Sequence, residues 1–160
     1  MRSVLAFDPG QTTGWCYMTD TGVWLMGEID CRDEILGVQE MLGMCGQYQQ
    51  SAVVFEDFIL DPGKATMGRE LLSPVRVTAM FEFGHAMTGY GNYIFLLNRS
   101  LVKSTCTDSR LKGWGLYDKH SGPHARDATR YAYYMLREWH AIHQGRMPIE
   151  VTKREPGERI

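Results

Sequence analysis

Apolar residues near the start of the chain occur in short runs separated by turn-forming residues, a pattern typical of strands. The first run, residues 3–8, ends in Asp8 followed by Pro-Gly, which predicts a buried strand that leads into a turn. Residues 14–18 and 23–29 are two more β-prone runs, and the Thr-Asp-Thr-Gly sequence between them is typical of a hairpin turn. This part of the chain therefore predicts three antiparallel strands.

The middle of the chain alternates between the helical and the strand pattern. Residues 33–50 place apolar side chains at roughly helical spacing, and residues 52–56 form a short apolar run that ends in Glu56. A strand that follows a helix in this way is typical of a right-handed βαβ crossover. Residues 57–72 have the composition of a loop. Ser73, as N-cap, and the proline after it then predict a helix that reaches about residue 88.

The second half of the chain adds one strand and the most regular helical pattern. Residues 93–97 predict a buried strand, and Thr107 can cap a short helix over residues 109–116. The last helix begins at Pro123 and carries an apolar stripe at Ala128, Tyr131, Ala132, Met135, Leu136 and Trp139.

These elements together predict an α/β fold. We expect a mixed five-stranded sheet, with three antiparallel strands followed by two parallel ones, flanked by helices. Residues 1–145 would form one domain, and residues 146–160, which are polar and contain two prolines, a C-terminal tail.

The composition fits a single domain in a reducing compartment. The 160 residues are 44% hydrophobic and 22% charged, as in ordinary globular proteins. No segment approaches the roughly 20 apolar residues that span a bilayer, and the N-terminal residues lack the pattern of a signal peptide. Four scattered cysteines without a CxxC pair predict free thiols. We therefore expect a cytoplasmic protein that does not bind a membrane.

The net charge of −2 conceals an uneven distribution of charge. The first 60 residues hold nine acidic and two basic residues, whereas the remaining 100 hold ten acidic and 15 basic residues. An acidic half is suited to metal ions and a basic half to phosphates, but charges that interleave on the folded surface would give the same count. The charge alone leaves both interpretations open.

Two predicted strands end in a carboxylate. If the strands that end in Asp8 and Glu56 are adjacent and parallel, both acids lie at the edge where open α/β sheets bind ligands. Two carboxylates at such a short distance repel each other unless a proton or a cation lies between them. Hard oxygen ligands favour Mg²⁺ or Mn²⁺. Taken singly, Asp8 also fits a turn-forming residue before Pro9, and Glu56 also fits a solvated acid at a strand end.

The start of the last predicted helix adds an imidazole and a third acid. His124 and Asp127 are three residues apart and therefore share one face of the helix. Beside Asp8 and Glu56 they outline a metal centre, in which two ions would activate a water and stabilise the leaving oxygen in phosphodiester hydrolysis. Asp127 alone also fits an acid placed favourably in the first helical turn.

Three short motifs, in this order and spacing, resemble the RuvC-type Holliday junction resolvases of the ribonuclease H-like superfamily. They are FDPG followed by Thr-Gly near the start, VVFE at the end of the fourth strand, and HARDA at the start of the last helix. The resemblance covers residues 1 to about 140 and implies a nuclease domain with catalytic metal ligands at Asp8, Glu56 and Asp127. His124 would take a fourth position held by His or Asp, with Mg²⁺ or Mn²⁺ as the cofactor, in two ions. The compact size is similar to that of phage-encoded members, so the expected cytoplasm is that of a bacterium or of a phage-infected cell.

The same resemblance implies contacts with DNA. Lys103 and, more loosely, Lys112 match lysines that meet the cleaved strand, and Phe58 is the nearest match to a residue that wedges into the junction. The offset of this phenylalanine and the short stretch before the last helix depart from the family pattern, which bears on junction selectivity more than on nuclease chemistry. Arg126 and Arg130 lie on a basic stripe of the last helix that can contact phosphates or simply keep the helix soluble.

These features predict a metal-dependent endonuclease that cleaves branched DNA, with Holliday junctions as the expected substrate. The alternatives are a flap or fork nuclease of the same fold, a fragment of an actin-like ATPase or sugar kinase, and a non-catalytic nucleic-acid-binding module. The ATPase class needs two such domains, and a binding module has no use for acids that repel phosphates. Metal-dependent cleavage of a labelled branched duplex would separate these classes.

The predicted helix over residues 74–88 is apolar around more of its circumference than one sheet face can cover. Members of the resembled family pair through the corresponding helix, so we expect a homodimer with two active sites. The alternative is a monomer in which residues 57–72 fold over this helix.

Overall fold

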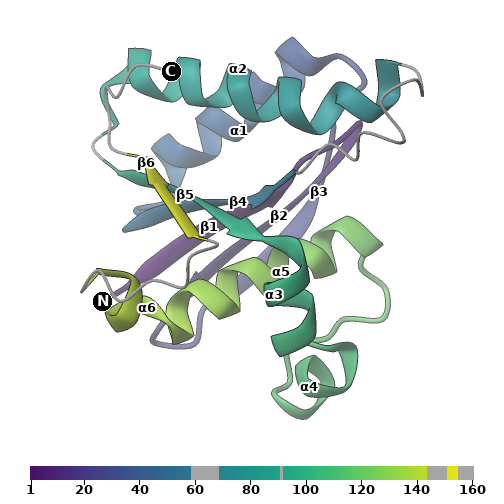
Figure 1. Cartoon of the computed structure of the whole chain (residues 1–160), viewed down its shortest axis with the longest axis vertical. Helices are drawn as coiled ribbons and strands as arrows, with labels where there is room; N and C mark the ends of the chain where they lie inside the picture. The colour runs from purple at the N-terminus through teal and green to yellow at the C-terminus, as the bar shows by residue number, and fades with distance from the viewer. Residues whose placement is uncertain (59–68, 91, 144–150, 155–160) are drawn as a thin grey trace.

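The computed structural model describes residues 1–58, 69–90, 92–143 and 151–154. These residues contain one sheet of six strands in the order β3-β2-β1-β4-β5-β6 (Figure 1). The strands are β1 (Ser3–Asp8), β2 (Thr12–Thr19), β3 (Trp24–Asp30), β4 (Ala52–Asp57), β5 (Tyr93–Asn98) and β6 (Val151–Arg154). β1, β2 and β3 are antiparallel, and β1, β4 and β5 are parallel. The predicted arrangement of five strands is confirmed.

The sixth strand, β6, was not predicted. It pairs antiparallel with β5 and lies within residues 146–160, for which the sequence predicts a polar tail. A run of four residues that includes a Lys and an Arg is too short and too polar to signal a strand. Short, charged strands are nevertheless usual at sheet edges, where they discourage further pairing.

Helices cover both faces of the sheet (Figure 1). One face carries α1 (Glu34–Gln47) and α2 (Ser73–Thr88). The other carries α3 (Arg99–Thr105), α5 (Pro123–Arg137) and α6 (Trp139–His143), with α4 (Asp108–Gly113) beyond α3. A 3₁₀ helix, η2 (Arg69–Leu72), precedes α2, and most of the predicted loop over residues 57–72 lies outside the described residues.

Side-chain caps explain several helix starts, and one prediction about them was wrong. Asp33 caps α1, Asn98 caps α3 and Thr107 caps α4, each by accepting a backbone N–H in the first turn. α3 was not predicted because it follows β5 directly, without a turn between them. Ser73 is not the cap of α2: it is the first helical residue, and its buried Oγ has no hydrogen-bond partner within the described part of the chain.

Strand alternation determines which acids face which helices. In β1 and β4, one series of side chains packs with α3 and α5, and the alternate series packs with α1 and α2. The first series consists of Val4, Ala6, Ala52 and Val54, and the second of Leu5, Phe7, Val53 and Phe55. Asp8 and Glu56 continue the first series and therefore belong to the face of α5. Asp57 continues the second series and belongs to the opposite face.

The four cysteines are free thiols, as predicted, and all are buried. Burial raises the pKa of the Cys16 thiol to about 12, so it remains protonated and serves as a packing group. Among the helices that the structure describes, none combines the length and the apolarity needed to cross a membrane.

Candidate active site

Asp8 and Glu56 meet at the carboxyl ends of two adjacent parallel strands. β1 and β4 pair up to Phe7 and Phe55, so the next residues, the two acids, lie side by side. Both are buried, with 8% and 5% of their surface exposed. Burial above all, with a contribution from the charge of Asp8, raises the pKa of Glu56 to about 7. The two carboxylates thus share a low-dielectric environment, in which a nearby cation would stabilise their charged forms.

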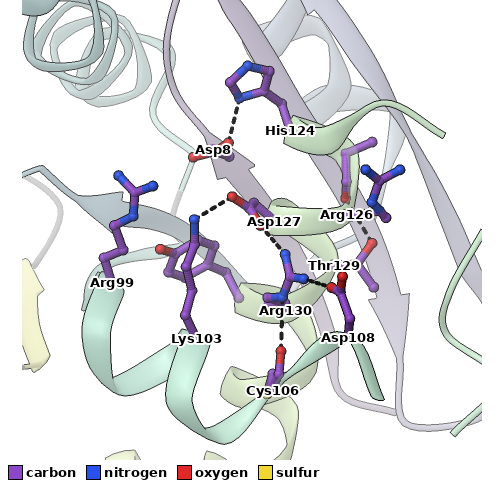
Figure 2. A network of polar contacts seen from close by, with 12 residues as sticks. Asp8, Arg99, Lys103, Cys106, Asp108, His124, Arg126, Asp127, Thr129 and Arg130 are labelled. Carbon is purple, nitrogen blue, oxygen red and sulfur yellow. Dashed lines mark hydrogen bonds and ion pairs between the residues drawn. The ribbon is translucent and has the colours of Figure 1, made fainter. Parts of the chain in front are cut away.

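α5 brings His124 to this pair because its first turn lies directly on β2. Gly14 of β2 pairs with Asp8, and a β-carbon at Gly14 would overlap the carbonyl group of His124 and come within 2.6 Å of Ala125 N. Only glycine permits this approach. The Nδ1 atom of His124 lies 2.8 Å from Asp8 Oδ2 (Figure 2), and this hydrogen bond raises the pKa of the imidazole.

Asp127, one turn further along α5, faces two cations (Figure 2). Lys103 of α3 places its Nζ 2.5 Å from Asp127 Oδ2, and Arg130 contacts the other carboxylate oxygen. Arg130 also pairs with Asp108, and its Nε donates to the carbonyl oxygen of Cys106 at 2.9 Å. Lys103 therefore lies at the site, whereas the guanidinium of Arg130 is engaged by three groups of the protein itself.

Two residues that were not predicted as part of the site also contact the acids. The hydroxyl of Tyr131 donates to Glu56 Oε2 at 2.7 Å, although the sequence pattern had assigned this side chain to the core. Arg99 of α3 places its Nη1 3.4 Å from Glu56 Oε1. Tyr131 could have been found, because it follows Asp127 by four residues and so shares its helix face. Arg99 gave no such signal, since α3 itself was not predicted.

The remaining residues predicted to contact DNA lie at two separate places on the molecule. Lys112 and Arg126 both lie over the ring of Tyr117, at 4.6 and 5.6 Å from its centroid, so one aromatic side chain supports two cations. Arg126 also donates to the carbonyl oxygen of Ser121. Phe58 directly follows β4 and lines a cavity of about 240 Å³ between the end of that strand and α2.

The donor set fits a divalent cation in its chemistry. Asp8 and Glu56 are hard oxygen ligands held close together, and burial above all raises the pKa of Glu56, so a cation beside the pair would favour its charged form. As the side chains stand, the described residues contain no group of three or more His, Cys, Asp or Glu that could hold a metal ion. Asp127 faces Lys103 instead. The chemistry of a divalent cation is therefore matched by Asp8 and Glu56, whereas Asp127 is paired with Lys103 in the structure.

Comparisons with known proteins identify the fold. No protein-family model and no curated protein matches the chain. Among solved structures, T. thermophilus RuvC in complex with a Holliday junction substrate matches with a TM-score of 0.67, at 14% identity, over 91% of this chain and 97% of that chain. A second structure, of Thermus thermophilus RuvC, matches with a TM-score of 0.61, at 13% identity, over 95% of this chain and 99% of that chain. The chain therefore has the ribonuclease H-like fold of RuvC.

Proposed function

We propose that this chain is a metal-dependent endonuclease that cleaves branched DNA and resolves four-way junctions. The observation that carries the proposal is the convergence of Asp8, Glu56 and His124 at one edge of the sheet. The RuvC fold of the chain supports it, because the matched structure contains a Holliday junction substrate. Buried acids at the carboxyl edge of a parallel sheet are also where ligands bind in open α/β folds.

In this proposal Asp8 and Glu56 hold Mg²⁺ or Mn²⁺, and His124 and Asp127 complete the ligand set. Two such ions would supply the charge that activates a water and stabilises the leaving oxygen of a phosphodiester. Tyr131 fixes the orientation of the Glu56 carboxylate through its hydrogen bond. His124 can act as a ligand only through a neutral ring nitrogen.

Lys103 has a second role in this proposal. Its ammonium group neutralises Asp127 in the structure, at 2.5 Å. If Asp127 held a divalent cation, the ammonium group of Lys103 would be available to pair with a phosphate of the strand to be cut. Lys112, Arg126 and Phe58 would extend the contact to the arms of the branched substrate.

We also propose that the protein pairs as a homodimer through α2. Val75, Phe83 and Met87 of α2 are exposed, as are Ile35 and Leu36 of the neighbouring α1. Several large apolar side chains exposed on two neighbouring helices are typical of an interface. A two-fold interface needs only one self-complementary patch, and it would present two active sites to one two-fold-like junction.

The test is cleavage of end-labelled substrates: a four-way junction, a fork, a flap and a linear duplex, each with Mg²⁺, Mn²⁺ or EDTA. The wild type should cut the four-way junction with either metal and should be inactive in EDTA. Asp8→Asn, Glu56→Gln and Asp127→Asn should each abolish cleavage, because each removes a charged ligand. Junction binding should persist or tighten, since each change removes a negative charge near phosphate.

Asp57→Asn is the matched control, because Asp57 is adjacent to Glu56 but belongs to the opposite face of the sheet. It should retain activity. Cleavage by Asp8→Asn, or equal losses for Asp57→Asn and Glu56→Gln, would contradict the assigned site. Preference for the fork or flap over the junction would instead favour a general structure-selective nuclease.

A further inference from the structure

We propose that Glu28 of β3 is a positioning residue for the active site, whose carboxylate holds the first turn of α5 so that His124 reaches Asp8. This inference rests on the proposed function, in which His124 and Asp8 are metal ligands. It adds a residue that contributes no ligand itself but sets the place of one.

Strand pairing puts Glu28 beside the site in two steps. Asp8 of β1 pairs with Gly14 of β2, and Gly14 pairs with Glu28 of β3. Directly paired residues of neighbouring strands project from the same face of a sheet. The three residues therefore form a row across the sheet on the face that α5 covers. The middle residue has no side chain, so the row has a gap between two carboxylates.

The first turn of α5 occupies this gap. On one side, the backbone N–H groups of His124 and Ala125 donate to Glu28 Oε1, at 3.1 and 3.3 Å. On the other side, the ring of His124 contacts Asp8 at 2.8 Å. The two acids thus hold the same residue, one through its backbone and the other through its imidazole.

α5 has no cap of its own for these N–H groups. Its N-cap residue is Gly122, which offers no side-chain hydrogen bond, and its first turn contains no acidic residue. The first N–H groups of a helix need hydrogen-bond acceptors. Glu28 supplies such an acceptor from a position 96 residues earlier in the chain.

Gly122 also leaves the room that Glu28 needs. A β-carbon at Gly122 would overlap the carboxylate of Glu28, although the backbone there, with φ of −65°, would accept any residue. Gly122→Ala should therefore displace the Glu28 carboxylate without altering Glu28 itself. This gives a second, independent way to break the same contact.

The test compares Glu28→Ala, Glu28→Gln and Glu28→Asp, with Glu40→Ala on the exposed side of α1 as the control. If Glu28 acts by reach and by accepting two N–H bonds, Gln should substitute for it. Asp, shorter by one methylene, should fail despite its charge. We expect kcat for junction cleavage to fall by about tenfold or more in Glu28→Ala and Glu28→Asp, the usual size of effects on groups that orient metal ligands. KM should change little, and Glu28→Gln and Glu40→Ala should stay near the wild type.

Two measurements on the protein without DNA or metal accompany the kinetics. Hydrogen exchange at the His124 and Ala125 amides should accelerate by about fivefold in Glu28→Ala, as expected for the loss of a helix cap. The ring-nitrogen chemical shifts of His124 should move toward those of Asp8→Asn, because the contact with Asp8 is lost. Gly122→Ala should give the same changes, and the double variant should be no worse than either single one.

Activity in Glu28→Asp with loss in Glu28→Gln would overturn the proposal, because charge rather than reach would then matter. Unchanged amide exchange and ring shifts in Glu28→Ala would also overturn it. If the wild type cuts none of the branched substrates, the proposed function fails. The exchange and ring-shift measurements still decide whether Glu28 holds His124 against Asp8.

Discussion

At the scale of single residues, each acid of the candidate site has a cationic or hydrogen-bonding partner of its own. Asp8 has the imidazole of His124, and Asp127 has Lys103 and Arg130. Glu56 has a contact with the exposed Arg99 and with the hydroxyl of Tyr131, and burial above all raises its pKa to about 7. A divalent cation would therefore favour the charged form of Glu56 and would compete with Lys103 at Asp127.

Arg130 should act as a structural link between helices. Its side chain is only 12% exposed, and it joins Asp127 of its own helix to Asp108 of α4. Arg130→Ala should lower the free energy of unfolding by about 2 kcal/mol, the usual scale for hydrogen bonds to charged groups. Urea denaturation would measure this. Arg137→Ala on the same helix, where the arginine is half exposed, should change stability by less than about 1 kcal/mol. Equal effects would contradict the structural role.

His85 should make folding stability depend on pH. It is buried against Phe81 and Tyr90, and its Nε2 has no hydrogen-bond partner among the described residues. Burial lowers the pKa of this imidazole, so the folded state binds a proton less readily than the unfolded state. The neutral His85 side chain therefore contributes fully to the free energy of unfolding above the pKa of about 6.5 that it has in the unfolded state. This contribution is lost as the pH falls through the lower pKa of the folded state.

His85→Leu should remove this contribution. In denaturation curves measured from pH 8 to pH 5, the wild type should lose stability relative to the variant as the pH falls, because only the wild type carries the buried imidazole. A constant difference between them across that range would show that His85 does not titrate with unfolding.

At the scale of elements, α5 is the element that assembles the site. It supplies His124, Asp127 and Tyr131 from one face, and its first turn lies on β2 because Gly14 leaves space there. The sheet supplies Asp8 and Glu56 from the ends of β1 and β4. The site therefore depends on the distance between one helix and one sheet face.

Gly14→Ala should separate these two elements. The added β-carbon would overlap the His124 carbonyl, which is backbone and cannot move without the helix. We expect a loss of several kcal/mol in unfolding free energy, as for overpacking in a well-packed core, and loss of junction cleavage. Gly43→Ala is the control: this exposed position in α1 has open space, and alanine there should stabilise the protein by about 0.5–1 kcal/mol. A Gly14→Ala protein as stable and active as the wild type would show that α5 does not need this close approach.

Local patterns predicted the elements of the site and the proximity of Asp8 to Glu56, but not the contacts that hold α5 against the sheet. Asp8 and Glu56 could be placed because strands ending in acids are visible in the sequence. The three-residue spacing likewise placed His124 and Asp127 on one helix face. Glu28 could not be found, because its contact with His124 joins residues 96 positions apart and no periodicity links them.

Most elements of the fold, like those of the site, could be predicted from the sequence. The order and direction of five strands followed from apolar runs and turns. α3 and β6 escaped because one follows a strand without a turn and the other is four residues long. Their positions depend on packing against β5, which only the folded sheet provides.

At the scale of the whole molecule, the two faces of the sheet have different surfaces. The face of α5 carries the acids and their cationic partners. The face of α1 and α2 exposes large apolar side chains, among them Phe83 at 70% and Met87 at 73%. Phe81 of the same helix is fully buried in the core, so only its outward neighbours can form an interface.

This apolar face should make the protein a dimer in solution. Light scattering should give twice the 18.3 kDa mass of one chain. Phe83→Glu should give a folded monomer, because a charge in the centre of a two-fold interface is opposed by its own copy. Leu25→Glu changes an apolar side chain that is 45% exposed on the edge strand β3 rather than on α2, and it should leave the dimer intact. With two active sites uncoupled, the Phe83→Glu monomer should still nick a four-way junction but should lose paired, symmetric cuts. A wild type that remains monomeric when bound to the junction would contradict the dimer, since one active site would then have to make both cuts in separate encounters.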